Sequence, residues 1–168
     1  VVCTLGEYKI PNDRPLVDGA GVVNVADAAM AVGLRRFVLV SSLGSGDSWD
    51  WLPFPVKAYF YVLRARPILE AKTRSDAHVR SLDLDWTILW PAYLTNRPMQ
   101  AEPILTSEGR AGGTSSRQAV ADTAVRCLAS PGAVGQTITV VDSFMRFTFR
   151  GGSRIELDTP WEAWTKGS

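Results

Sequence analysis

The stretch Phe37-Val-Leu-Val-Ser-Ser42 decides the fold, together with Trp86-Thr-Ile-Leu-Trp-Pro91, which follows after a long helical region. Both begin as short, continuous apolar runs, as expected of parallel strands that helices cover on both faces. Each run ends in small or polar residues, at the edge where open α/β sheets bind their ligands. The two stretches therefore predict part of a doubly wound α/β fold with a parallel sheet.

Helical patterns connect the expected strands. An initial strand over residues 1–5 is joined to the strand at Phe37 by apolar residues at helical spacing, namely Val22, Val23, Ala26, Ala29 and Met30. This arrangement is a right-handed strand-helix-strand crossover. A second helical region runs from about Pro55 to Arg80, with a break near Pro67, because proline cannot donate an N–H to a continuing helix.

The segments after Pro91 complete the expected sheet. We predict a long loop from Asn96 to Ser116, which could serve as a substrate lid, because the segment is rich in Pro, Gly, Ser and Thr. A helix over residues 117–129 and a strand over residues 137–141 follow, since their apolar residues lie on one face or form a short run.

The end of the chain carries a different pattern. Residues 145–150 alternate with period two and predict a hairpin with residues 154–157 through Gly151-Gly152. Large aromatic residues then occupy the tail around Trp161 and Trp164. We therefore divide the chain into a sheet domain, 1–142, and a C-terminal hairpin with an aromatic tail, 143–168.

Composition excludes several classes of protein. The 168 residues are 46% hydrophobic and 21% charged, with a net charge of +1, which argues against a nucleic-acid binder. No apolar run reaches the roughly 18 residues of a transmembrane helix. His78 is the single histidine, so the sequence has almost no candidate residues for a histidine-based metal site or a Ser-His-Asp triad. Cys3 and Cys127 are expected to be buried, reduced thiols.

Several short segments together resemble a known family. They are Arg36-Phe-Val-Leu-Val-Ser-Ser-Leu-Gly44, Gly46-Asp-Ser-Trp49, Lys72 with Asp76, and Leu84-Asp-Trp-Thr-Ile-Leu-Trp-Pro91 with Leu94. Their order and spacing resemble the atypical short-chain dehydrogenase/reductase group, which includes the NmrA-like and flavin-reductase-like NAD(P)-binding proteins. The resemblance covers roughly residues 1–142 and implies a Rossmann-like sheet that binds NADP or NAD.

The family's opening motif is absent from this sequence. Members begin with a strand and a G-x-x-G-x-x-G turn, whose backbone N–H groups hold the cofactor pyrophosphate. Residues 1–6 instead resemble the family's fourth strand. We therefore expect the N-terminal strands to be absent from this chain, and a missing segment or a protein partner to cover Val1 to Leu5.

The resemblance also implies a site at the ends of three strands. Its cofactor and substrate contacts would be Thr4, Leu5, Gly6, Ser41, Ser42, Leu43, Pro91, Ala92 and Tyr93. Lys72 matches a helix lysine near the ribose, where an ammonium can bind hydroxyls and lower a neighbouring acid's pKa. The alternative for Ser41 and Ser42 is that they merely end a strand and satisfy turn hydrogen bonds.

Two departures from the family bear on catalysis. Ile68 stands where dehydrogenases have the tyrosine that protonates the substrate, and Trp90 stands where the family commonly has arginine. Lys72 and Tyr93 are our candidate catalytic residues, with Tyr59 and Tyr61 as alternatives to Tyr93, and nothing in the sequence places any of the three hydroxyls beside Lys72. The aromatic segment 47–61 is either a pocket wall, a docking surface or a loop packing its own side chains.

Three functions remain open. The first is an NAD(P)-dependent oxidoreductase-like protein that transfers hydride to a small carbonyl, flavin or quinone acceptor. The second is a non-catalytic structural or regulatory subunit of a larger complex, and the third is a non-redox enzyme on the same fold. We expect an intracellular soluble protein, in the cytoplasm or an organelle stroma, or one peripheral to an organellar membrane complex.

Overall fold

The computed structural model describes residues 1–7, 10, 14–99, 102–107, 111–142, 147–148 and 153–158. Of residues 59, 111, 112, 147 and 148 it describes the backbone alone. The expected aromatic tail therefore lies outside the described residues.

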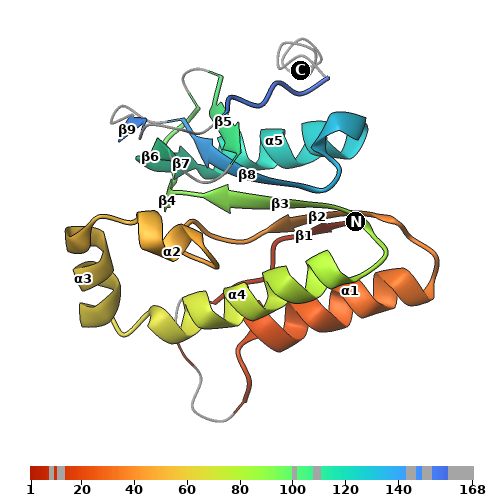
Figure 1. Cartoon of the computed structure of the whole chain (residues 1–168), viewed down its shortest axis with the longest axis horizontal. Coiled ribbons are helices and arrows are strands. Elements are labelled where there is room, and N and C mark those ends of the chain that lie inside the picture. Colours follow the sequence, from red (N-terminus) through yellow and green to blue (C-terminus); the bar gives the residue numbers. More distant parts are fainter. Residues whose placement is uncertain are drawn as a thin grey trace.

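A mostly parallel sheet forms the centre of the protein (Figure 1). Its strands, in spatial order, are β1 (Val2–Cys3), β2 (Arg36–Val40), β3 (Asp85–Pro91), β8 (Gln136–Val141) and β5 (Ile104–Ser107). The first four run parallel, and β5 is antiparallel to β8. The expected α/β, Rossmann-like fold with a parallel sheet is confirmed, and β1 lies at one edge of the sheet as predicted.

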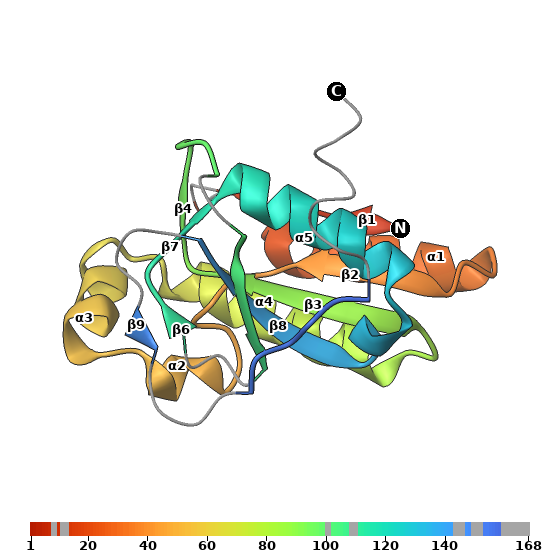
Figure 2. The same cartoon turned by 90° about the horizontal axis from the view of Figure 1, so that it is seen from above.

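Helices cover both faces of the sheet, as the continuous apolar strands require. Figures 1 and 2 show α1 (Val22–Ala31) and α4 (Arg66–Ser81) on one face, with α5 (Arg117–Ala129) on the other. A single π-helical turn, η1 (Val17–Gly21), leads directly into α1. Neighbouring residues of β2 therefore enter different cores: Phe37 and Leu39 pack with α1 and α4, and Val38 packs with α5.

The second helical region is broken near Pro67, as predicted, but the break lies just before the proline. Its helices are α3 (Phe54–Val62) and α4, and the short helix α2 (Ser48–Trp51) precedes them. Between α3 and α4 lies Arg64, whose φ of 52° is left-handed. Pro67 lies in the first turn of α4, where its missing N–H has no partner to lose. The proline therefore begins a helix instead of interrupting one.

The segment from Asn96 to Ser116 is not simply a loop. In addition to β5 it contains β6 (Ala111–Gly112) and β7 (Thr114–Ser116), and β7 pairs with β4 (Tyr93–Thr95). The hairpin prediction is wrong for the residues described, because β9 (Phe147–Thr148) pairs with β6 and Arg154 pairs with Thr106. A short 3₁₀ turn, η2 (Pro131–Ala133), separates α5 from β8.

Candidate functional site

The carboxyl ends of β1, β2 and β3 meet at one edge of the sheet, because these strands are parallel and adjacent. The segments that leave them are 4–6, 41–43 and 91–93, which contain the expected cofactor contacts. Backbone hydrogen bonds join the second and third segments, from the N–H of Ser41 to the carbonyl of Leu89 and from the N–H of Leu43 to the carbonyl of Pro91. The sheet therefore holds these two segments in a fixed relation.

The expected contact residues differ in their exposure. Thr4, Leu5 and Gly6 are exposed, and 65% of the Tyr93 surface is accessible. Ser41, Pro91 and Ala92 are buried, and Ser42 and Leu43 are half-buried. A ligand at this edge would meet the backbone and side chains of residues 4–6 and 42–43 before the buried positions.

The two serine hydroxyls take part in the turn after β2. Ser42 Oγ donates to the carbonyl of Leu43 over 3.0 Å, and Ser41 Oγ lies 3.4 Å from Ser45 Oγ. These contacts satisfy turn hydrogen bonds, which is the alternative role considered for both residues. Ser42 keeps part of its surface accessible, whereas Ser41 is 6% exposed.

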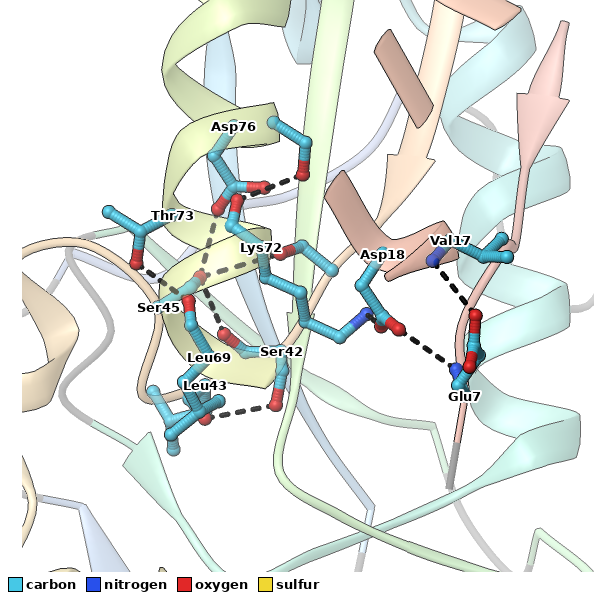
Figure 3. Close-up of polar contacts among 12 residues, drawn as sticks. Glu7, Val17, Asp18, Ser42, Leu43, Ser45, Leu69, Lys72, Thr73 and Asp76 are labelled. Atoms are coloured by element: carbon cyan, nitrogen blue, oxygen red, sulfur yellow. Dashed lines mark hydrogen bonds and ion pairs between the residues drawn. The ribbon is translucent and has the colours of Figure 1, made fainter. Parts of the chain in front are cut away.

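Lys72 reaches from α4 to the segment that follows β1 (Figure 3). Its ammonium lies 2.8 Å from Oδ1 of Asp18, a side chain with 0% exposure in the π-helical turn. A Cβ placed on Gly6 would lie 3.2 Å from Asp18 Oδ1 and 3.6 Å from Lys72 Nζ. The absence of a side chain at Gly6 therefore leaves the ion pair open to the carboxyl edge of the sheet.

Hydrogen bonds fix the position of Asp18. Its Oδ2 accepts from the backbone N–H of Glu7 over 2.9 Å, and Glu7 Oε1 accepts in turn from the N–H of Val17 over 2.9 Å. The hydrogen bond from Arg14 is the main reason that the pKa of Glu7 lies below its usual range. This reciprocal pairing ties the segment after β1 to the start of the first long helix.

A second polar cluster lies one turn further along α4. Asp76 is 0% exposed, and its Oδ2 lies 2.8 Å from Ser45 Oγ and accepts from the indole N–H of Trp90 over 2.9 Å. Trp90 is itself buried, and its ring contacts that of Trp51 at an interplanar angle of 59°, with ring centroids 6.1 Å apart. The tryptophan in the family's arginine position therefore belongs to the core and supplies its N–H to a buried acid.

The candidate acids do not gather around Lys72. Tyr93 lies on β4, and no contact between its hydroxyl and Lys72 is found among the described residues. Tyr61 is engaged elsewhere, since its hydroxyl accepts from Arg66 over 2.8 Å, and the side chain of Tyr59 is outside the described part. Ile68 lies half-buried on α4, one turn before Lys72, and has no proton to donate.

Sequence reasoning missed Asp18. A carboxylate between Val17 and the small residues Gly19, Ala20 and Gly21 looks like part of a polar loop before the helix. Its only signal is the first-turn position, where aspartate commonly stabilises a helix N-terminus. Asp18 comes close to Lys72 only because the π-helical turn packs against α4.

Other classes of site find no support in the described residues. They contain no group of three or more His, Cys, Asp or Glu side chains that could hold a metal ion. No helix in the same ranges is both long and apolar enough to cross a membrane. Cys3 and Cys127 are buried, unpaired thiols, as predicted.

Comparisons with known proteins agree with this geometry. A family model described as NAD(P)H-binding matches residues 1–131. An uncharacterized chloroplastic protein of Arabidopsis thaliana is 32% identical over 114 residues, covering 67% of this chain and 40% of the relative. A UPF0659 protein of Saccharomyces cerevisiae is 30% identical over 131 residues, covering 75% of this chain and 54% of the relative. The chain thus spans about half the length of these curated relatives.

Solved structures show the same architecture. The Escherichia coli O157:H7 anaerobillin reductase ChuY aligns with a TM-score of 0.69 and 26% identity, over 86% of this chain and 64% of that one. A short-chain dehydrogenase/reductase from Veillonella parvula, solved in complex with NADP, aligns with a TM-score of 0.67 and 17% identity, over 88% and 65%. The parallel sheet, the edge at which its strands end and the family match lead to one conclusion: this chain belongs to the NAD(P)H-binding family, with the atypical short-chain dehydrogenase character that its motifs predict.

Proposed function

We propose that this chain forms the nicotinamide-facing part of an NAD(P)-dependent oxidoreductase that acts on a small carbonyl, flavin or quinone acceptor. The observation that carries the proposal is the Lys72 ammonium, which Asp18 holds at the edge where three parallel strands end. The family match, the NADP complex of the Veillonella protein and the reductase activity named for ChuY support it. Bound NADPH or NADH would supply the hydride.

The residues at this edge fit a nucleotide. Gly6 leaves space that a Cβ would fill, beside an ammonium whose side chain is 14% exposed. A ribose hydroxyl placed there could accept a hydrogen bond from Lys72, and the backbone of residues 4–6 and 42–43 could pack against the ring. Asp18 acts as a positioning residue, because it fixes the ammonium without being exposed itself.

An ordinary dehydrogenase mechanism at this site also needs a proton donor, and Tyr93 is our proposed donor. With 65% of its surface exposed, the residue is accessible to a substrate. A flavin acceptor would lessen this requirement, since the protein then mainly orients cofactor against acceptor. In either case Lys72, Tyr93 and the segments 4–6, 41–43 and 91–93 form the proposed site.

Nucleotide titration tests the proposal directly. NADPH and NADH are titrated by calorimetry into the product of the full open reading frame that encodes this chain. Replacing the ion pair by the neutral pair Asp18→Asn/Lys72→Met should weaken binding by about tenfold, or roughly 1.4 kcal/mol. Lys57→Met is the control. Lys57 lies on α3, and its ammonium is over the ring of Trp49, whereas Asp18 pairs with Lys72. Equal affinity in the double variant and the control would overturn the role of Lys72.

A second candidate function is a non-catalytic subunit of a larger assembly. It is favoured by apolar side chains that stand exposed around α3, with Phe54 at 81% and Val62 at 80% exposure. Large exposed apolar side chains close together are typical of interaction surfaces. Nucleotide binding without turnover of any quinone, flavin or carbonyl acceptor would favour this candidate over the oxidoreductase.

A further inference from the structure

Asp76 is a buried acid with no charged partner. It has no exposed surface, and none of the ion pairs among the described residues includes it. Its Oδ1 is buried without a hydrogen-bond partner. An ionised carboxylate in such a place loses its hydration, and hydrogen bonds to Oδ2 replace only part of it. Proteins generally avoid that cost by neutralising the group.

Ser45 has a single hydroxyl proton for two short contacts. Ser45 Oγ lies 2.8 Å from the carbonyl oxygen of Ser42 and 2.8 Å from Asp76 Oδ2. A carbonyl oxygen can only accept, and a serine hydroxyl carries one proton. The Ser42 carbonyl also accepts from the backbone N–H of Ser45 over 3.1 Å. If the hydroxyl proton goes to Ser42, the short contact with Asp76 is a hydrogen bond when the carboxyl group donates; if it goes to Asp76, the carboxylate accepts it.

The groups that hydrogen-bond Asp76 are uncharged. Trp90 donates its indole N–H to Oδ2 and brings no positive charge. Arg80, on the same helix, is the charged side chain that acts on Asp76, and its guanidinium lies over the rings of Trp86 and Trp90. Burial raises the pKa of Asp76 despite hydrogen bonding by Trp90, Ser41 and Ser45 and the charge of Arg80.

We propose that Asp76 is an uncharged carboxylic acid in the folded protein at neutral pH, and that the proton it donates to Ser45 positions the turn 42–46. The turn carries Ser42 and Leu43, two of the residues at the carboxyl end of β2 (Figure 3). Asp76 is thus a positioning residue that acts through Ser45. This positioning step rests on the proposed function, whereas the protonation state of Asp76 does not.

Infrared spectroscopy with isotope-labelled aspartate tests the protonation state. At neutral pH the wild-type protein should show the carbonyl band of a protonated carboxylic acid, and Asp76→Asn should lack it. Ser45→Ala removes the acceptor and should shift the band without abolishing it. This variant keeps the test open if Asp76→Asn fails to fold. A wild-type spectrum containing only ionised aspartate would overturn the proposal.

The positioning step is tested by the pH profile of NADPH affinity. Wild-type affinity should fall as pH rises through the pKa of Asp76, while Asp76→Asn should give a flat profile over the same range. Asp27→Asn is the control, because Asp27 is exposed and pairs with His78 at the surface. If the infrared band is present but the pH profiles of NADPH affinity are identical in wild type and Asp76→Asn, the positioning role is overturned. The band without any NADPH binding would refute the proposed function and, with it, the positioning role, but leave the protonated acid established.

Discussion

Lys72 and Asp18 form an ion pair of 2.8 Å between α4 and the π-helical turn before α1. The two elements cover the same face of the sheet, and Asp18 is fully buried while Lys72 keeps 14% of its side chain exposed. The pair therefore fastens two helical segments together as well as presenting an ammonium at the carboxyl edge of the sheet.

The first prediction concerns the energetics of this pair. Lys72→Met should lower the free energy of unfolding by about 3 kcal/mol, because it leaves the buried carboxylate of Asp18 without its cation. Asp18→Asn/Lys72→Met should recover much of that loss, since neither partner is then charged. Urea denaturation of both single variants and the double variant measures the coupling. Strictly additive losses would contradict the prediction.

A second prediction compares Trp90, which is buried, with Trp86, which is half-buried. Both lie on β3 beneath the guanidinium of Arg80, but only Trp90 donates its N–H to Asp76. Trp90→Phe should therefore cost about 1–3 kcal/mol more than Trp86→Phe, because it removes a hydrogen bond from a buried acid. Chemical denaturation of the two variants decides the matter. Equal losses would mean that the indole N–H of Trp90 contributes little.

Much of the fold was predictable from long, uniform patterns. The strands at Phe37 and Trp86 and the helix over residues 117–129 were identified because continuous apolar runs and helical spacing are local signals. Strand β5 was missed, since its four residues become a strand only by pairing with β8. The partner of residues 147–148 was mistaken for the same reason, because strand pairing is a tertiary property.

The site was less predictable than the sheet. The ends of three strands could be named because the carboxyl edge follows from parallel topology. Asp18 could not be, since its burial depends on a turn packing against a distant helix. Asp76 belonged to a recognised motif, but its hydrogen-bond partners Trp90 and Ser45 lie on other parts of the chain.

Gly6 gives a third prediction. A Cβ at this position would lie 3.2 Å from Asp18 Oδ1, a tight contact with an atom that is itself held by hydrogen bonding and an ion pair. Gly6→Ala should therefore weaken NADPH binding severalfold and leave the sheet folded. Gly132→Ala is the control, because its Cβ would meet only the end of the Asp158 side chain at 3.4 Å. Calorimetry and circular dichroism provide the two readouts. Unchanged affinity in Gly6→Ala would show that ligands do not approach this glycine.

The two thiols provide a fourth prediction. Burial raises the pKa of Cys127 to about 12 and also raises that of Cys3, so both remain protonated at neutral pH. The thiolate is the reactive form, and neither group should react with Ellman's reagent in the folded protein. Both should react once guanidinium chloride unfolds the chain. Rapid labelling of one thiol under native conditions would reveal local opening at that residue.

The edge of the sheet gives the last prediction. Among the described residues β1 pairs with β2 alone, and Val1, Val2 and Leu5 are 38%, 38% and 36% exposed. An apolar edge strand without charge or proline favours association, because its unpaired backbone groups can accept another strand. The 168-residue chain by itself should therefore oligomerise or aggregate in sedimentation experiments. Val2→Lys should reduce this association by placing a charge on the edge. Val32→Lys, at a site of 70% exposure just after α1, should not. A stable monomer of the unmodified chain at every concentration would show that this edge does not recruit a partner.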